Sequence, residues 1–360
     1  GVQTCALPIC GYLGVHLGLI GVSSSRDELA SVLAHELSHV TQRHIARLLS
    51  QQSKQSPLMM GAMVLGLLAA SRNPQAANAM IVGGQAVAIQ NQLNFSRDME
   101  READRVGYGV MTQAGFEPQG FVSLFEKLQQ AARLNDSGGY PYLRSHPMTT
   151  ERIADMQARQ QLLTLASPAP PRLAHQLLSA RARVLANPGV DAQRFFSADA
   201  QQENRSPGQR AAALYAGVMA DLRLRDHGLL RARLEELRLL TQADPEAQQQ
   251  VKWLSAEVAL QTGAPLQAIA LLGTQGKDRA ARFLLAQSRI ATGLPAQGAL
   301  AAQDLLGWTA LQPRDAHGWE LLGQALGLQG DTLRAIRAQA EARAMELDYG
   351  AAVDRFKAAQ

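Results

Sequence analysis

Three residues near the start of the chain have the types and spacing that bind and use a metal ion. They are His35, Glu36 and His39, within the stretch "ELASVLAHELSHVTQRHIARLL". On a helix, positions i and i+4 differ by about 40° in azimuth, so both imidazoles project from one face. That spacing suits one tetrahedral zinc ion, and Glu36 beside it could take a proton from activated water and pass it to a leaving amine. The alternative is an ordinary polar helix face.

A catalytic zinc ion needs three protein ligands and one open position. The sequence lacks the glycine and third histidine of the pattern HExxHxxGxxH. Glu100, in "SRDMEREADRVG", is the candidate third ligand, and Asp104 lies one turn later on the same expected helix face. Metal-bound histidines donate their second N–H to a carboxylate, so Asp104 is expected beside His35. The alternative is that both acids pair with the three arginines of the same stretch on a solvated surface.

A further histidine, His146, lies in "RSHP" at the end of a stretch rich in turn residues. Two functional roles are open. It could bind the zinc as a fourth ligand and block it, or it could stabilise an oxyanion, alone or with Arg144, Tyr140 or Tyr142. A surface histidine without a role is the third possibility.

The elements that must position these residues are mostly helices. Ser25 followed by Glu28 forms a capping-box pattern at a helix start. His44 follows His39 by five residues, so on a continuous helix it points to a different face and is not expected to be a ligand. The expected helices span residues 26–51, 96–115, 121–134 and 149–163, and a strand is expected over 11–20.

Two apolar segments separate the metal motifs, at 57–70 and 77–95. The uninterrupted run from Leu58 to Ala70 has 13 residues, fewer than the roughly 20 that a membrane span needs. The second segment is interrupted by polar residues. A buried helix, or a hairpin that covers the cleft or touches a membrane surface, is therefore expected, with at most peripheral membrane contact.

Composition favours a mainly helical protein and excludes one class of partner. Apolar residues make up 46% of the chain and aromatic residues 5%, and Ala, Leu and Gln are abundant. The formal charge is +4 over 360 residues, without a concentrated run of Lys and Arg. This pattern gives no support to nucleic-acid binding.

Four segments are expected along the chain. Residues 1–10 resemble a translated sequencing adapter and are expected to be non-native, so that the authentic sequence begins near Gly11 and is truncated at its front. Residues 11–165 form the expected metal-binding domain. The Pro-rich stretch 166–172 is the expected linker, and residues 173–360 form a helical repeat domain.

The repeat prediction depends on glycine spacing in the last half of the chain. Gly228, Gly263, Gly293 and Gly330 recur at intervals of 35, 30 and 37 residues. The unit that begins "WELLGQALGLQGDTLRAIRAQA" matches a tetratricopeptide repeat. The alternative is an irregular helical bundle. The positions that carry the match are Trp319, Leu322, Gly323, Leu326, Gly330 and Ala335.

Taken together, "LAHELSHVTQRH", "SRDMEREADRVG", "SHPMTTERI" and the repeats resemble the BepA/YfgC-type periplasmic zinc metalloproteases, which belong with the HtpX/Ste24-like gluzincin peptidases. The resemblance covers nearly the whole chain from Gly11. It implies a mainly α (α+β) fold, with a small sheet in a zincin-like domain, and one Zn²⁺ per chain.

The resemblance also implies roles and a setting. His35, His39 and Glu100 would bind the zinc, Glu36 would be catalytic, and Asp104 would lie behind the ligands. His146 would be a reversible extra ligand. The strand at 11–20 looks like the family's edge strand, where a substrate backbone could pair. Such enzymes work in the periplasm, where they degrade unfolded or stalled outer-membrane proteins and assist their assembly, and their repeats dock the assembly machinery.

Two other functions remain open from the sequence. A chaperone or scaffold with a latent or structural zinc site would be expected if His146 closes the metal with a fourth ligand. An intramembrane protease of HtpX type would be expected if the two apolar segments were embedded in a bilayer.

Overall fold

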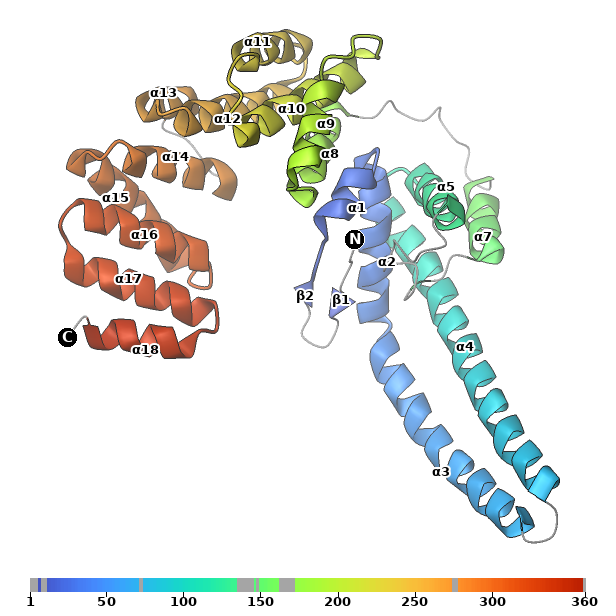
Figure 1. Cartoon of the computed structure of the whole chain (residues 1–360). Coiled ribbons are helices and arrows are strands. Elements are labelled where there is room, and N and C mark those ends of the chain that lie inside the picture. The colour runs from blue at the N-terminus through green and yellow to red at the C-terminus, as the bar shows by residue number, and fades with distance from the viewer. Residues whose placement is uncertain are drawn as a thin grey trace. The chain divides into compact units, whose positions relative to one another are not determined.

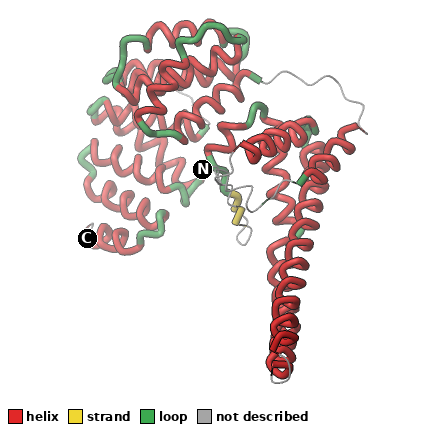
Figure 2. The backbone as a smooth tube through the Cα atoms, turned by 45° about the vertical axis from the view of Figure 1, so that its right-hand side comes forward, coloured by secondary structure: helices red, strands yellow, loops and turns green. Residues whose placement is uncertain are grey.

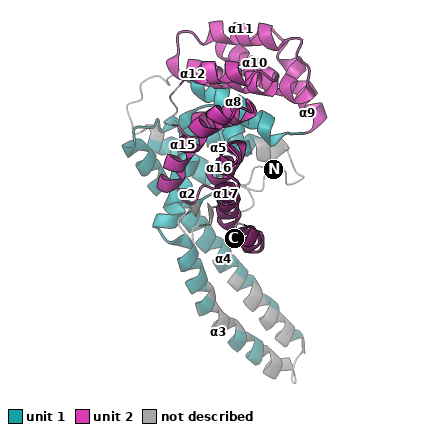
Figure 3. Cartoon of the chain, turned by 90° about the vertical axis from the view of Figure 1, so that its left-hand side faces the viewer, with its two compact units in different colours: residues 1–188 teal, residues 189–360 magenta. Residues whose placement is uncertain are grey.

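The computed structural model describes residues 6–7, 12–70, 74–134, 146, 149–161, 172–273 and 278–358. Nearly all of the described elements are helices (Figure 2). The chain divides into two compact units, Gly1–Pro188 and Gly189–Gln360 (Figure 3). The expectation of a mainly helical protein is therefore confirmed.

Unit 1 holds the predicted metal ligands. Its elements are β1 (Ala6–Leu7), β2 (Tyr12–Leu13), α1 (Leu17–Val22), α2 (Arg26–Thr41), α3 (His44–Ala70), α4 (Pro74–Gln113), α5 (Gln119–Leu134), α7 (Thr150–Gln161) and α8 (Leu173–Ala186). Unit 2 consists of α9 (Val190–Asp199), α10 (Pro207–Leu224), α11 (Leu230–Leu240), α12 (Pro245–Gln261), α13 (Pro265–Leu272), α14 (Arg279–Ala291), α15 (Pro295–Leu311), α16 (Ala316–Leu328), α17 (Thr332–Met345) and α18 (Tyr349–Ala358).

Helix α2 begins where its capping residues predict. The Ser25 side chain accepts a hydrogen bond from the Glu28 backbone N–H at 3.1 Å, and Glu28 in turn accepts from the Ser24 backbone N–H at 2.7 Å. The helix ends earlier than expected, because Arg43 adopts a left-handed backbone conformation with φ of 55°. The single helix expected over 26–51 is therefore two helices, α2 and α3, with a change of direction between them.

Helices α3 and α4 form a long hairpin, whose described residues 44–70 and 74–98 we call the arm. Figure 1 shows the two helices running side by side away from α2 and α5. The apolar segments 57–70 and 77–95 both lie in the arm, so they form a hairpin, one of the two expected arrangements. Within the described part of the chain, no helix has the length and apolarity needed to cross a bilayer.

The core of unit 1 lies at the base of the arm, where α2, α4, α5 and α7 pack together. Its aromatic centre consists of Phe121 and Phe125 from α5, with ring centroids 5.3 Å apart, and Tyr108 from α4. A second apolar cluster joins α1 to α2 and α5. The buried members of the two clusters are Ala34, Tyr108, Met111, Phe121, Val122, Phe125, Ile153 and Met156, and Leu19, Val32, Leu124 and Leu128.

The strand expected over 11–20 is wrong for most of its length. Among the described residues of this range, only Tyr12 and Leu13 form a strand, which pairs antiparallel with β1. The chain then enters α1, whose first turn is capped by His16: its Nδ1 accepts a hydrogen bond from the Gly18 backbone N–H at 3.1 Å. Leu19 is buried between α2 and α5, so apolar contacts favour a helix here although the residues alternate.

The boundary between the units also differs from the expected linker. Residues 162–171 lie outside the described residues, and α8, expected to begin the repeat domain, belongs to unit 1. Polar contacts explain this. The Ser179 hydroxyl contacts the carbonyl oxygens of Ile20 and Ser23 at 2.7 and 2.8 Å, and His175 Nε2 lies 3.1 Å from the Ser23 carbonyl. These contacts hold α8 against the end of α1.

Unit 2 contains successive helix pairs. In the pair α16 and α17, Leu322, Leu326 and Ala335 are buried, and Gly330 makes the turn between the helices with φ of 82°. A Cβ atom on Gly323 would lie 3.2 Å from the Ala335 carbonyl oxygen, so glycine allows the two helices to approach closely. The residues predicted to pack do so, and their assignment to tetratricopeptide repeats stays a prediction.

Candidate metal centre

The two histidines of α2 point to the same place. His35 and His39 lie one turn apart, and their Nε2 atoms are 3.0 Å from each other. The His35 side chain is fully buried, and that of His39 is 12% exposed. The helical spacing therefore brings two imidazole nitrogens together at the edge of the hydrophobic core.

The third predicted ligand arrives from α4. Glu100 Oε2 lies 3.4 Å from His35 Nε2, and Glu100 Oε1 lies 3.4 Å from His39 Nε2. Its side chain is only 5% exposed. A buried carboxylate with both oxygens facing imidazole nitrogens is no solvated surface acid, so the alternative of surface ion pairing is wrong for Glu100.

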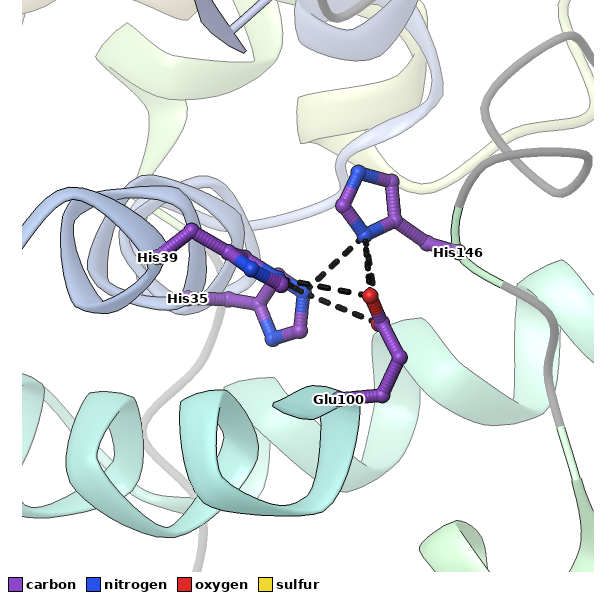
Figure 4. Close-up of side chains that lie close together, drawn as sticks. All are labelled: His35, His39, Glu100 and His146. Atoms are coloured by element: carbon purple, nitrogen blue, oxygen red, sulfur yellow. Dashed lines mark hydrogen bonds and ion pairs between the residues drawn. The ribbon is translucent and has the colours of Figure 1, made fainter. Parts of the chain in front are cut away.

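His146 completes the group (Figure 4). Its Nδ1 atom lies 3.0 and 3.1 Å from the two carboxylate oxygens of Glu100 and 3.4 Å from His35 Nε2. Arg144, Tyr140 and Tyr142, considered as oxyanion partners, lie outside the described residues. The position of His146 matches the fourth-ligand alternative.

The group has the donors and the spacing to hold one zinc ion. One ligand atom from each of His35, His39, Glu100 and His146 lies within 4.8 Å of all the others. Zinc bonds of about 2.0–2.2 Å at tetrahedral angles place neighbouring ligand atoms roughly 3.3–3.5 Å apart. The distances given above run from 3.0 to 3.4 Å. Imidazole nitrogen and carboxylate oxygen are also the donors that zinc accepts in catalytic sites.

Glu36 lies beside this group and is itself buried, with 2% of its surface exposed. Among the described residues, neither of its carboxylate oxygens accepts a hydrogen bond, although His146 Nε2 is 3.4 Å from Oε1. Burial raises the pKa of Glu36, and the neighbouring His146 and His35 partly oppose that rise. A buried carboxylate without a fixed donor is suited to accept a proton from water.

Asp104 and Arg152 lie behind the ligands. Asp104 Oδ1 is 2.8 Å from His35 Nδ1, the nitrogen that faces away from the metal group. Arg152, from α7, donates to Asp104 through Nε and a terminal nitrogen at 2.6 and 2.8 Å, and its other terminal nitrogen lies 3.1 Å from Glu100. One guanidinium thus joins both acids of α4, which fixes their orientation.

The pKa values of the group reflect burial and close charges. Burial lowers the pKa of His35, but its contacts with the Asp104 and Glu100 carboxylates outweigh burial and raise it to about 9. Burial and the neighbouring His35 lower the pKa of His39 to about 3. Burial opposes ionisation of Glu100, yet contacts with His146 and His35 hold its pKa well below the ordinary range. Because zinc binds neutral imidazole, metal binding must displace the His35 proton.

A close approach of α2 and α4 sets the position of Glu100 relative to the histidines. A Cβ atom built on Gly107 would lie 3.0 Å from the His35 backbone nitrogen and 3.1 Å from the Ala34 carbonyl carbon. These contacts are with backbone, which cannot move aside as a flexible side chain could. The glycine therefore keeps the ligand-bearing turns of the two helices in contact.

Two buried neighbours of the ligands, Arg152 and His44, were not predicted from the sequence. Arg152, within "SHPMTTERI", had no predicted role, since its hydrogen-bond partner Asp104 lies 48 residues earlier in the chain. His44 was expected on another face, and its Nδ1 instead lies 2.9 Å from His39 Nδ1. Arg152 could have been suspected because it is a cation six residues after His146. No local sequence pattern indicated His44.

Known proteins match the chain over both units. The family model "Peptidase family M48" matches residues 9–160. A relative from Vibrio cholerae is 38% identical over 54% of this chain and 40% of its own length. The beta-barrel assembly-enhancing proteases of Yersinia pestis and Escherichia coli (strain K12) are each 30% identical over 93% of this chain, and the matches cover 68% and 67% of their lengths.

These matches agree with the geometry of the site. The matched family segment contains the histidine pair, Glu100 and His146, and peptidases of this family use zinc. The four ligand atoms in unit 1 have the spacing and the donor types for that ion. The chain therefore belongs to peptidase family M48 and is a zinc metallopeptidase.

Proposed function

We propose that the chain is an endopeptidase in which His35, His39 and Glu100 hold the zinc and Glu36 is the general base. The observation that carries the proposal is the convergence of the ligand atoms within 4.8 Å, with the buried carboxylate of Glu36 beside them. Asp104 orients His35 through its Nδ1.

The residues divide the chemistry of peptide hydrolysis between them. A zinc ion held by these residues would polarise the peptide carbonyl and lower the pKa of a water molecule. Glu36 accepts the proton of the attacking water at its carboxylate and then delivers it to the amine of the leaving half. Burial of Glu36 raises its pKa, which brings it closer to the operating pH and makes the carboxylate a stronger base toward the proton of the water.

His146 serves in this proposal as a reversible latch. Its Nδ1 lies among the ligands, and its Nε2 faces Glu36 at 3.4 Å, so one imidazole covers both the fourth metal position and the base. Peptide cleavage needs that position to be open. The His146 ring must therefore leave before a substrate carbonyl can enter.

Replacing His146 with alanine should raise the rate of peptide cleavage, because the fourth position then opens without displacement of a ligand. The measurement is cleavage of unfolded casein by wild type and His146→Ala at equal zinc loading. A fall in rate would assign His146 to oxyanion stabilisation instead. An inactive wild type and an inactive variant, both loaded with zinc, would favour the chaperone or scaffold function.

The proposed substrates follow from the relatives and from unit 2. Two relatives matched over 93% of this chain are described as beta-barrel assembly-enhancing proteases. We infer that this chain acts in the periplasm, where it degrades misassembled outer-membrane proteins and assists the assembly of others. The helix pairs of unit 2 would dock the client or the assembly machinery, as tetratricopeptide repeats dock other proteins.

Metal removal tests this function directly. Cleavage of an unfolded outer-membrane β-barrel protein should stop after treatment with a chelator and return with one equivalent of zinc. The same barrel protein, folded in detergent, should resist cleavage, because the strands of a closed barrel are paired on both sides and leave no free edge to enter the site. Equal cleavage before and after chelation would contradict the zinc mechanism, and equal cleavage of folded and unfolded barrels would contradict the quality-control role.

A further inference from the structure

His44, the first residue of α3, lies next to the metal-binding group, in contact with His39. On one continuous helix, five residues correspond to a rotation of about 140° relative to the starting face, which would turn His44 away from His39. The left-handed conformation of Arg43 interrupts the helix, and α3 begins afresh at His44. His44 is consequently buried, with its ring centroid 4.8 Å from that of His39.

The contacts of His44 define a chain of hydrogen bonds. His39 faces the other ligands through Nε2, so its Nδ1 carries the proton when a metal binds. That proton points at His44 Nδ1, 2.9 Å away, which must then accept it. The proton of neutral His44 therefore lies on Nε2, which is 3.2 Å from Glu102 Oε2. Arg47 donates to the same oxygen at 2.7 Å and completes the chain.

We propose that His44 is a positioning residue for zinc, which fixes the ring of His39 through a histidine-to-histidine hydrogen bond ending at Glu102. His44 has the same place relative to His39 as Asp104 has relative to His35. The acceptor beside His39 is a neutral imidazole nitrogen, whereas the acceptor beside His35 is a carboxylate oxygen. The inference rests on the zinc site rather than on the proposed substrates.

The two ligands of α2 thus have unlike supports. His35 contacts a carboxylate at 2.8 Å that also holds Arg152, whereas His39 contacts an imidazole whose own partner, Glu102, has a side chain 36% exposed. Outer hydrogen-bond partners of metal ligands typically change metal affinity by about 10- to 100-fold. If His44 only filled space, the zinc affinity would not depend on which of its two nitrogen positions a substitution preserves.

The test compares substitutions that keep one nitrogen position or the other. In His44→Asn the amide oxygen can occupy the place of Nδ1 and accept from His39, whereas in His44→Gln the amide lies near the place of Nε2. In His44→Leu both polar atoms are lost. Zinc dissociation constants are measured by competition with a chromophoric chelator, which does not depend on peptide cleavage.

We expect His44→Leu and His44→Gln to bind zinc about 10- to 100-fold more weakly than wild type. His44→Asn should recover most of that loss. Equal affinity in His44→Gln and His44→Asn would overturn the proposal, as would wild-type affinity in His44→Leu. Should the leucine variant fail to fold, the two polar variants still decide the question, because both keep an amide in the same buried space.

Two further variants complete the experiment. Glu102→Leu removes the acceptor at the end of the chain and should weaken zinc binding by a smaller factor; an unchanged affinity would remove Glu102 from the proposal. His317 is a matched control in unit 2, because its Nδ1 also contacts a glutamate, Glu320, at 3.1 Å. His317→Leu should bind zinc as wild type does. A wild type that binds no zinc would contradict the metal centre itself, which is a different failure.

Discussion

Replacing Glu36 with glutamine should reduce peptide cleavage by about 100- to 10,000-fold, the range that general acid–base catalysis contributes. Glutamine has nearly the same shape but cannot accept and return a proton at neutral pH. Zinc should remain bound, because Glu36 is not among the four residues whose ligand atoms converge. The measurements are cleavage of an unfolded protein substrate and zinc content of the same sample.

The same substitution should leave the fold intact. The Glu36 carboxylate is 2% exposed, and among the described side chains no donor hydrogen-bonds to it. Burying such a charge opposes folding. Glu36→Gln should therefore unfold at the same denaturant concentration as wild type or at a higher one.

Glu28 provides the matched control, because it is an equally buried glutamate on α2 with a structural environment. Its carboxylate accepts hydrogen bonds from the Lys127 ammonium, at 2.7 Å, and from the Ser123 hydroxyl, at 3.0 Å. Glu28→Gln should lower stability while the folded fraction keeps its activity. Wild-type activity in Glu36→Gln would show that another group acts as the base.

Replacing Arg152 with leucine should lower the free energy of unfolding of unit 1 by about 3–5 kcal/mol when no zinc is bound, the usual loss when one partner of a buried ion pair is removed. The guanidinium lies against Glu100 and Asp104, both almost fully buried. Without it, two carboxylates share one buried space with too little positive charge. A bound zinc ion supplies charge beside Glu100, so the loss should be smaller in zinc-loaded protein.

Denaturant unfolding of the protein with zinc and with a chelator measures both effects. Arg105 is the matched control, because it also joins α4 to α7, through Asp155 at 3.1 Å, but on the surface. Arg105→Leu should cost only about 0–1 kcal/mol, with or without zinc. If Arg152→Leu and Arg105→Leu had equal effects, Arg152 would not be balancing the buried acids.

The parts of the site that could be predicted from sequence are those whose geometry is local. His35 and His39 share a helix face because of their spacing alone, and Asp104 follows Glu100 by one turn for the same reason. That the two helices meet could not be obtained from spacing. It depends on Gly107, which permits contact between helix backbones, and a single glycine within a helical pattern carries no such information.

The residues that were missed depend on long-range contacts or on a single backbone angle. The partners of Arg152 lie on α4, so its burial follows from the packing of α7. His44 depends on φ at Arg43, a residue type that rarely adopts the left-handed region. The strand prediction at 11–20 failed because tertiary packing of Leu19 overrode a short alternating pattern.

The length of the arm can change independently of the metal ligands. Helix α3 begins at His44, and Glu100 lies in the second half of α4, so the candidate metal site involves only the ends of these helices that are remote from Ala70 and Pro74. Removing matched turns from the outer ends of α3 and α4 would shorten the arm without altering the spacing of any metal ligand within its own helix. The length of the arm can therefore be varied by evolution or by an engineer while the spacing of the metal ligands stays the same.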